Sequence, residues 1–152
     1  MVERTLILVK PDGVQRGLIG EVISRFERRG LKLVAMKFML PTESILAKHY
    51  EAHINKGFYP GLVSYLTSGP VVAMVWEGWD AIKACRLTIG DTHANEAPAG
   101  TIRGDLAIHI SRNIVHGSAD ANDAAREVPI WFSDDELISY ERATELWITR
   151  PD

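Results

Sequence analysis

The amino-acid sequence predicts an α/β fold, a ferredoxin-like βαββαβ sandwich with an antiparallel sheet and extra helices. Short β-rich apolar runs alternate with segments whose apolar residues recur every three or four positions. In chain order these segments read β-α-β-β-α-β, which is the order of such a sandwich. The chain has 152 residues with no repeat and no low-complexity tract, so residues 1–152 are expected to form a single domain.

The first three elements follow from apolar spacing and from turn residues. Residues 5–9 predict a strand, and the sequence KPDG at residues 10–13 predicts a turn after it. Five apolar residues between positions 18 and 26 recur at helical spacing, and Gly30 stands where a C-terminal cap belongs. Residues 31–40 predict the second strand, which a proline ends.

The middle of the chain predicts two helical segments and the central strand. Thr42 is a helix cap, and its helix is expected to run to about residue 53. Residues 57–61 break that helix, and residues 62–66 make one or two further helical turns. Residues 71–76 are a continuous apolar run, which predicts a central strand buried on both faces.

The last third predicts a helix, a long loop, a short strand and a final helix. Residues 79–87 are helical, and residues 88–103 form an irregular stretch containing glycine and proline. A loop of that length inside a compact domain is usually functional or disordered. Residues 114–116 predict the last strand, and residues 122–127 predict the helix after it.

The composition is that of a globular protein and argues against some partners. Apolar residues make up 46% of the chain, and the net charge of -3 opposes nucleic acid or an anionic membrane as the main partner. No stretch is long and apolar enough to suggest a signal peptide or a membrane span. The single cysteine, Cys85, suggests a reducing compartment, so the cytoplasm is the expected location.

Three of the five histidines are candidates for a chemical role, the pair His49 and His53 and the single residue His116. His49 and His53 are spaced i, i+4 on a predicted helix, but no third metal ligand is evident, and a solvated helix face is favoured. His116 follows a β-branched pair and precedes Gly117 and Ser118, so it is expected where a strand ends. A histidine there can be a nucleophile or a base, although its position alone favours a structural role.

Three cations suggest a phosphate clamp. Lys10 ends the first strand, while Arg86 and Arg103 flank the long loop that contains Thr92. Polyphosphate needs several positive charges with hydroxyl or backbone donors, and the planar fork of arginine suits phosphate oxygens. Solvated surface charge is the alternative. No P-loop and no glycine-rich dinucleotide fingerprint occurs, and Phe58, beside a break between helices, could be an exposed stacking platform.

Four segments resemble motifs of the nucleoside diphosphate kinase family, and they occur in the order that the family has. The segment NIVHGS at residues 113–118 resembles the family's active-site signature. The other three segments are VKPDGVQRG at residues 9–17, SGPVVAMVWEG at 68–78 and GTIRGD at 100–105. Together they are spread along most of the chain, from residue 9 to residue 118, which makes chance similarity very improbable.

This resemblance implies a ping-pong transfer of the γ-phosphoryl group through a phosphohistidine at His116, with broad base and sugar specificity. It implies Mg²⁺ that is carried by the nucleotide phosphates, with no metal held by the protein. By position, the residues that match the family's phosphate ligands are Arg86, Thr92 and Arg103. Lys10 and Asn113 match residues that contact the sugar, and Lys10 also lies near the transferred phosphate. Tyr50 matches a neighbour of the histidine, Ser118 and Glu127 match residues that orient it, and Phe58 matches the platform for the base.

The chain departs from the family pattern at three places. Ala119 stands where the family usually has aspartate, His93 and Ala94 stand where it has asparagine and proline, and Ala99 stands where proline is frequent. The resemblance also implies a homo-oligomer. A hexamer is favoured, because the length and the C-terminal extension through Trp147 resemble the hexameric members.

Two other classes of protein compete with the enzyme. A nucleotide-binding regulatory domain without turnover would keep Phe58 and the cations, but it would not need His116 together with Ser118 and Glu127. A DNA-binding protein would need a basic stripe or interleaved aromatic residues, which the sequence lacks. The enzyme is therefore the favoured interpretation, with no nucleic acid and no membrane among the expected partners.

Overall fold

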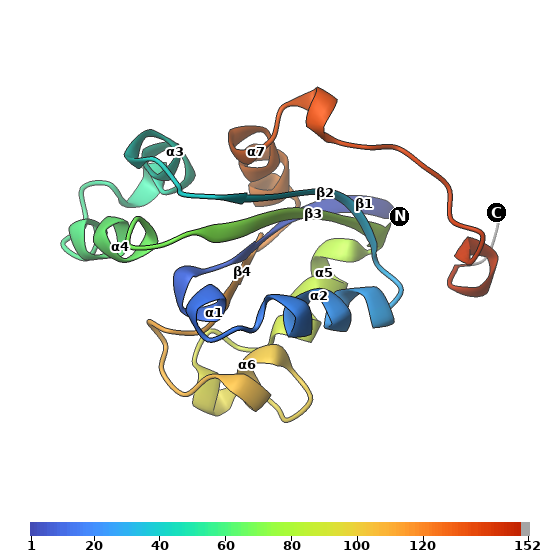
Figure 1. Cartoon of the computed structure of the whole chain (residues 1–152), viewed down its shortest axis with the longest axis horizontal. Coiled ribbons are helices and arrows are strands. Elements are labelled where there is room, and N and C mark those ends of the chain that lie inside the picture. Colours follow the sequence, from blue (N-terminus) through green and yellow to red (C-terminus); the bar gives the residue numbers. More distant parts are fainter. Residues whose placement is uncertain (150–152) are drawn as a thin grey trace.

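The computed structural model describes residues 1–149, and these form an antiparallel sheet with helices on both faces (Figure 1). The strands are β1 (Val2–Val9), β2 (Lys32–Met39), β3 (Val71–Trp79) and β4 (Val115–Gly117). Their order in the sheet is β2-β3-β1-β4, and every neighbouring pair is antiparallel. The predicted α/β class is confirmed.

Strands β1 and β3 form the centre of the sheet and pair along their whole lengths, from Val2 opposite Trp79 to Val9 opposite Val72. Residues 71–76 are all buried, as the continuous apolar run predicts. Because side chains alternate along a strand, β1 sends Ile7 to one face of the sheet and Leu6 to the other. Each face therefore has its own apolar core.

The helices are divided between these two cores. Helices α2 (Ile19–Arg28), α5 (Ala81–Ile89) and α6 (Ile102–Leu106) cover the face that contains Ile7. Helices α3 (Glu43–His49), α4 (Tyr59–Leu66) and α7 (Ala121–Trp131) cover the face that contains Leu6. Figure 1 shows α3 and α7 above the sheet and α2, α5 and α6 below it.

Three differences from the predicted boundaries occur at prolines. The KPDG segment forms a short helix, α1 (Pro11–Gln15), instead of a turn. Helix α4 begins at Tyr59 and has Pro60 in its first turn, where the backbone N–H that proline lacks has no helical partner. Helix α7 continues past Glu127 through Pro129 to Trp131, whose buried side chain packs on the sheet.

Other boundaries also differ. Helix α3 ends at His49, and a separate 3₁₀ turn covers Glu51–His53. Strand β1 begins three residues earlier than expected, and Trp79 belongs to β3 instead of α5. These changes are local and leave the order of the predicted strands unaltered.

The stretch at residues 88–103 is more regular than the sequence suggests. It contains the end of α5, a 3₁₀ turn at Ala94–Glu96 and the start of α6, whose N-cap Thr101 accepts a hydrogen bond from the amide of Gly104 (2.9 Å). Thr101 also donates its hydroxyl to the carbonyl of Pro98 (2.7 Å). These hydrogen bonds fold the segment back on itself beside α5.

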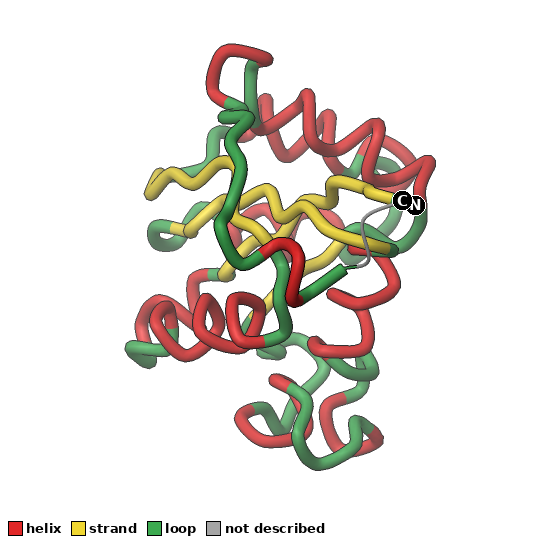
Figure 2. Tube along the Cα trace, turned by 90° about the vertical axis from the view of Figure 1, so that its right-hand side faces the viewer, coloured by secondary structure: helices red, strands yellow, loops and turns green. Residues whose placement is uncertain are grey.

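The chain after α7 crosses the outer edge of β2, and Figure 2 shows it running in front of the strands. Strand β2 has an irregularity between Leu33 and Ala35, and there the amide of Ile138 donates to the carbonyl of Val34 (2.8 Å). Tyr140 donates to the carbonyl of Leu33 (2.7 Å). No helix among the described residues is long and apolar enough to cross a membrane.

Gly104 tests how tightly the 88–106 segment is packed. A Cβ at this position would lie 2.0 Å from the carbonyl oxygen of Pro98, so Gly104→Ala must displace the backbone. We expect urea unfolding to show a loss of about 1–3 kcal/mol, the usual range for overpacking. Gly57→Ala is the matched control, because nothing lies within 4 Å of its added Cβ. Equal unfolding midpoints for both variants would contradict this packing.

Candidate active site

His116 lies in the middle of β4, opposite Leu8 of β1, and not at a strand end as the sequence suggested. The predicted strand covered residues 114–116 and ended at His116, whereas β4 is shifted by one residue and continues to Gly117. Val115 belongs to the core beneath the sheet, so alternation turns His116 toward the face covered by α3 and α7. Because β4 is an edge strand, the ring also reaches solvent, and its side chain is 22% exposed.

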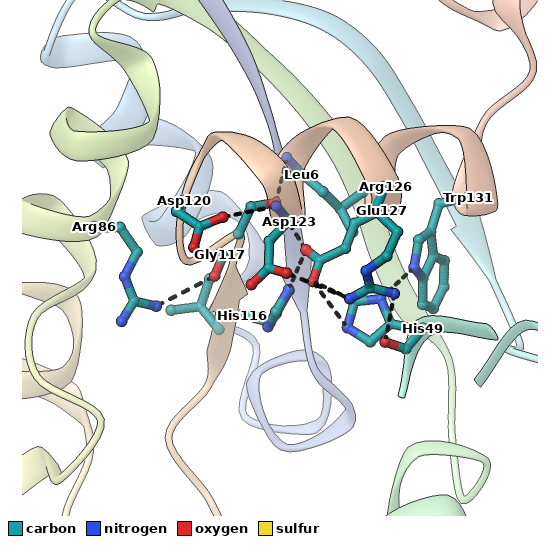
Figure 3. A network of polar contacts seen from close by, with 12 residues as sticks. Leu6, His49, Arg86, His116, Gly117, Asp120, Asp123, Arg126, Glu127 and Trp131 are labelled. Carbon is teal, nitrogen blue, oxygen red and sulfur yellow. Dashed lines mark hydrogen bonds and ion pairs between the residues drawn. The ribbon is translucent and has the colours of Figure 1, made fainter. Parts of the chain in front are cut away.

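The imidazole of His116 is held by a buried carboxylate. Its Nε2 lies 3.0 Å from Oε1 of Glu127, which comes from α7 (Figure 3). The hydroxyl of Ser118 donates to the same oxygen (2.8 Å). Ser118 is itself fixed to β1, because its amide donates to the carbonyl of Leu6 (3.1 Å) and its hydroxyl accepts from the amide of Leu6 (3.3 Å).

These contacts settle which ring nitrogen carries the proton. Burial raises the pKa of the Glu127 carboxyl, but the interaction with His116 and the hydrogen bond from Ser118 outweigh it. The net pKa lies below the ordinary value, so the carboxylate is ionised at neutral pH. An ionised carboxylate only accepts hydrogen bonds, which assigns the proton of a neutral His116 to Nε2. The lone pair is then on Nδ1.

His49 is buried beside His116, which corrects the expectation of a solvated helix face. The two rings are 4.8 Å apart between centroids, and Trp131 donates its indole N–H to Nδ1 of His49 (3.0 Å). Nε2 of His49 lies 3.7 Å from Oε2 of Glu127. Burial and the neighbouring His116 lower the pKa of His49 to about 3, so this ring stays neutral.

Ligating atoms of His49, His116 and Glu127 lie within 4.8 Å of one another, which is the spacing of a possible metal site. However, Nδ1 of His49 accepts the Trp131 hydrogen bond, so a neutral His49 carries its proton on Nε2, the nitrogen that would have to bind the ion. Two imidazoles and one carboxylate also do not fit Mg²⁺, which prefers oxygen ligands in octahedral geometry. His53, the other member of the i, i+4 pair, instead contacts Phe58.

Arg103 is 4% exposed and binds three backbone carbonyls around the start of β4. Its guanidinium donates to the carbonyls of Asn113 (3.2 Å), Val115 (2.6 Å) and Gly90 (3.2 Å). A guanidinium has five N–H groups, so two remain for a ligand. Burial and the nearby Arg86 lower its pKa to about 10, which leaves it protonated at neutral pH.

Lys10, Asn113 and Thr92 form a connected chain of polar contacts. The ammonium of Lys10 donates to the side-chain carbonyl of Asn113, whose amide donates to the backbone carbonyl of Thr92 (3.0 Å). Burial lowers the pKa of Lys10 to about 8, with further lowering from Arg103 and Arg112 that Asp12 partly offsets. Three segments far apart in the sequence therefore meet through these contacts.

Some of the predicted residues line two pockets. One of about 370 Å³ contains Arg86, which donates to the carbonyl of Gly117 (3.3 Å), and Thr92. The other, of about 550 Å³, contains His116 and Tyr50, whose ring packs edge-on against His49 at 4.5 Å between centroids. Burial raises the pKa of the Tyr50 hydroxyl.

The remaining positions lie nearer the surface. Phe58 is 56% exposed and contacts His53 and Lys56. Ala119 is also exposed, and the next residue, Asp120, caps α7 by accepting from the amide of Asp123 (2.8 Å). The helix start is therefore capped without an aspartate at position 119.

Comparison with known proteins shows which family the chain is similar to. A sequence model of the nucleoside diphosphate kinase family matches residues 3–137. Nucleoside diphosphate kinase A2 of Xenopus laevis is 49% identical over 146 residues, covering 96% of this chain and 95% of the relative. The crystal structure of a nucleoside diphosphate kinase family protein from Babesia bovis has a TM-score of 0.95 and 51% identity, covering 97% of this chain and 99% of that one.

The chain belongs to the nucleoside diphosphate kinase family.

A nucleoside diphosphate kinase is a transferase that binds nucleotides, and this chain is an enzyme of that kind. A further solved structure, a halophilic nucleoside diphosphate kinase from Halobacterium salinarum in complex with CDP, has a TM-score of 0.94 and 48% identity. It covers 98% of this chain and 99% of that one. The agreement extends over nearly the full length of each chain.

Local sequence did not identify every group in this kinase's candidate site. The burial of His49 depends on Trp131, which lies 82 residues later in the chain. Asp12 accepts from the amide of Ile114 (3.0 Å), a contact across 102 residues. His49 lies in none of the motifs, and the motif that contains Asp12 does not indicate Ile114 as its partner, so the fold had to be known first.

The low pKa of His49 predicts a stability that depends on pH. The unfolded chain binds a proton at this residue near pH 6.5, whereas the folded protein does not until about pH 3. Stability is therefore lost as pH falls below 6.5, by about 1.4 kcal/mol per pH unit and about 2 kcal/mol by pH 5. Urea unfolding between pH 7.5 and 5 measures this slope. His49→Gln should flatten it, and an unchanged slope in that variant would contradict the assignment.

Proposed function

We propose that this enzyme transfers the γ-phosphoryl group from nucleoside triphosphates to nucleoside diphosphates by a ping-pong mechanism through a phosphohistidine at His116. The observation that carries the proposal is the 3.0 Å contact between Nε2 of His116 and the Glu127 carboxylate. This contact supports a nucleophilic Nδ1, because the proton of the ring is held on the other nitrogen. A partly exposed ring beside a pocket supports access for a phosphate.

The chemistry runs in two matched halves. Nδ1 of His116 attacks the γ-phosphorus, the bond from that phosphorus to the bridging oxygen breaks, and the nucleoside diphosphate leaves with the electron pair. The phosphorylated ring carries positive charge, which the anionic Glu127 stabilises through Nε2–H. A terminal phosphate oxygen of a second nucleoside diphosphate then attacks the phosphorus of the phosphohistidine. The bond between Nδ1 and phosphorus breaks, and His116 is released as the neutral imidazole.

The remaining residues bind, orient and neutralise. Phosphoryl transfer depends mainly on positioning and on spreading charge, so we assign the phosphates to Arg86, Thr92 and Arg103. Lys10 and Asn113 contact the sugar, with Lys10 also near the transferred phosphate. Their contacts with backbone carbonyls and with each other support rigid placement of these donors.

Tyr50, Ser118 and Glu127 complete the catalytic group. Ser118 orients the Glu127 carboxylate, which in turn orients His116. The Ser118 hydroxyl donates to Glu127 and accepts from the amide of Leu6 in β1. Tyr50 lines the pocket that His116 faces. The nucleotide enters as its Mg²⁺ complex, and the ion, carried on the phosphates, belongs to the substrate.

We also propose a homo-oligomer, most favourably a hexamer, located in the cytoplasm. Edge strand β2 exposes apolar side chains of Met36 and Phe38, and the C-terminal segment exposes Trp147. Exposed apolar groups of this kind mark protein contacts. The buried thiol of Cys85 fits a reducing compartment.

Labelling tests the phosphohistidine. Incubation with γ-labelled ATP should label the protein, and GDP should then remove the label. His116→Ala should abolish both labelling and transfer while far-UV circular dichroism stays unchanged, whereas His93→Ala, with an exposed ring, should retain both. The adduct should be labile in acid and stable in base, as a phosphoramidate is. A tenth of wild-type transfer in His116→Ala, or an acid-stable adduct, would refute the assignment.

Phe58 predicts broad specificity, because every base has a face that can stack on an aromatic ring. Such stacking contributes about 1–3 kcal/mol with little base preference. We expect kcat/KM for purine and pyrimidine nucleotides, ribo and deoxy, to agree within about a hundredfold, or nearly 3 kcal/mol. Phe58→Ala should weaken all bases together. A loss of kcat/KM confined to one base would show that the enzyme instead recognises the hydrogen-bonding edge of that base.

Light scattering tests the oligomer. We expect a mass near six times the 16.9 kDa of one chain at micromolar concentration. Phe38→Glu should lower that mass if β2 lies in a subunit contact, since it places a charge on an apolar surface that is 64% exposed in one chain. Lys56→Glu, outside β2, is the control. A stable wild-type monomer or dimer would overturn the proposal.

A further inference from the structure

Ile114, two residues before His116, has a strained backbone. Its φ of 72° lies in the left-handed region, which a β-branched residue rarely adopts. The amide of Val115 donates to the carbonyl of Asn113 (2.8 Å), which closes a γ-turn of the strained kind around Ile114. The side chain is fully buried, so the strain is inside the protein and not at a flexible surface.

A strained conformation persists only where its surroundings hold it. Here one carboxylate oxygen of Asp12 accepts from the amide of Ile114 (3.0 Å). The amide of Lys10 donates to the carbonyl of Ile114 (2.8 Å). Both backbone groups of the strained residue are therefore bound by Lys10, between β1 and α1, and by Asp12, in the first turn of α1.

The other oxygen of Asp12 is also occupied. The hydroxyl of Tyr65, in α4, donates to it, and the guanidinium of Arg112 lies 4.0 Å from the centre of the Tyr65 ring. A Cβ added to Gly13 would lie 3.0 Å from Cγ2 and 3.1 Å from the carbonyl oxygen of Ile114. Helix α1 is thus packed directly against the turn, and Tyr65 fixes the direction of the carboxylate.

The turn at Ile114 joins the cation cluster to the strand that carries the histidine. Asn113, on one side, carries the amide that binds Lys10 and the carbonyl that Arg103 binds. On the other side, Val115 and His116 pair with β1. If Ile114 relaxed to a negative φ, the path of the chain into β4 would change, and His116 would shift relative to the cations.

We propose that Asp12 is a positioning residue, which holds the strained turn at Ile114 and thereby places His116 for phosphoryl transfer. The inference rests on the proposed function, because it concerns the geometry of the same reaction. Both carboxylate oxygens of Asp12 are already bound, by the Tyr65 hydroxyl and the Ile114 amide, so we assign Asp12 no contact with the reacting atoms. Its effect passes through the backbone of Ile114 to the strand that carries the histidine.

A rescue experiment separates positioning from general stability. Asp12→Ala should lower kcat and the single-turnover rate of His116 phosphorylation by about 10- to 100-fold, the range for a misplaced reacting group. Adding Ile114→Gly should restore the rate to within about threefold of Ile114→Gly alone, because glycine adopts positive φ without steric cost. Adding Ile114→Ala should not restore it, although it removes nearly the same buried volume.

Asp80→Gly is the matched control, because Asp80 is the other described non-glycine residue with positive φ, at 46° and far from the site. It should leave the rate unchanged. A wild-type rate in Asp12→Ala would overturn the proposal. Equal rates in the two double variants would overturn it as well, since a purely stabilising aspartate gives that result.

The crystal structure of Asp12→Ala supplies a readout that needs neither activity nor the Ile114 variants. A negative φ at Ile114 with a displaced His116 is the expected result, and a φ still near 70° would overturn the proposal. This measurement also keeps the two hypotheses distinct. If wild-type protein forms no phosphohistidine, the proposed function fails, whereas the control of the turn by Asp12 is still decided by that φ.

Discussion

The arrangement of the site depends on one buried carboxylate. Glu127 is 3% exposed, and a charge taken out of water costs several kcal/mol unless it is paired and hydrogen-bonded. Its partners are the imidazole of His116 and the hydroxyl of Ser118, both on the edge strand or just beyond it. Removing either group would leave the buried charge with one hydrogen bond fewer, so these contacts tie α7 to a strand only three residues long.

In the proposed mechanism, the same carboxylate acts on the chemistry through the ring that it holds. It keeps the proton on one nitrogen of His116 and would lie against the positive charge of a phosphorylated ring. His49 supports this arrangement from the opposite side. Its tautomer is set by Trp131, which directs an N–H at Glu127 in place of a lone pair, so the cluster acts as a network of donors around an anion and not as a metal site.

The cations are held in place before any phosphate arrives. Arg103 binds carbonyls on both sides of the turn at Ile114, and Arg86 binds the carbonyl after His116. Donors fixed in this way need little reorganisation when charge develops on a substrate. These cations also repel one another. Burial, together with the nearby charge of Arg103, lowers the pKa of Lys10 to about 8. The negative charge of a bound phosphate would offset that repulsion and raise the pKa of Lys10 again.

Much of this protein could be predicted from the sequence, for physical reasons that act locally. Periodicity of apolar residues determined the strands and helices, as in residues 71–76, whose continuous run predicted a strand buried on both faces. Motifs in one order indicated the family and the candidate residues from Lys10 to Glu127. Boundaries at Pro11, Pro60 and Pro129 were missed, because proline is compatible with a first helical turn and tertiary packing can outweigh its penalty later.

What only the tertiary structure decided concerns pairs that are distant in sequence. His49 is buried because Trp131 and Glu127 of α7 pack against α3, and no property of the predicted helix indicated that. The strained φ of Ile114 is maintained by Asp12, which lies 102 residues earlier. Local sequence determines which backbone conformations have low free energy. The burial and tautomer of His49 and the strain at Ile114 depend instead on which surfaces the folded chain brings together.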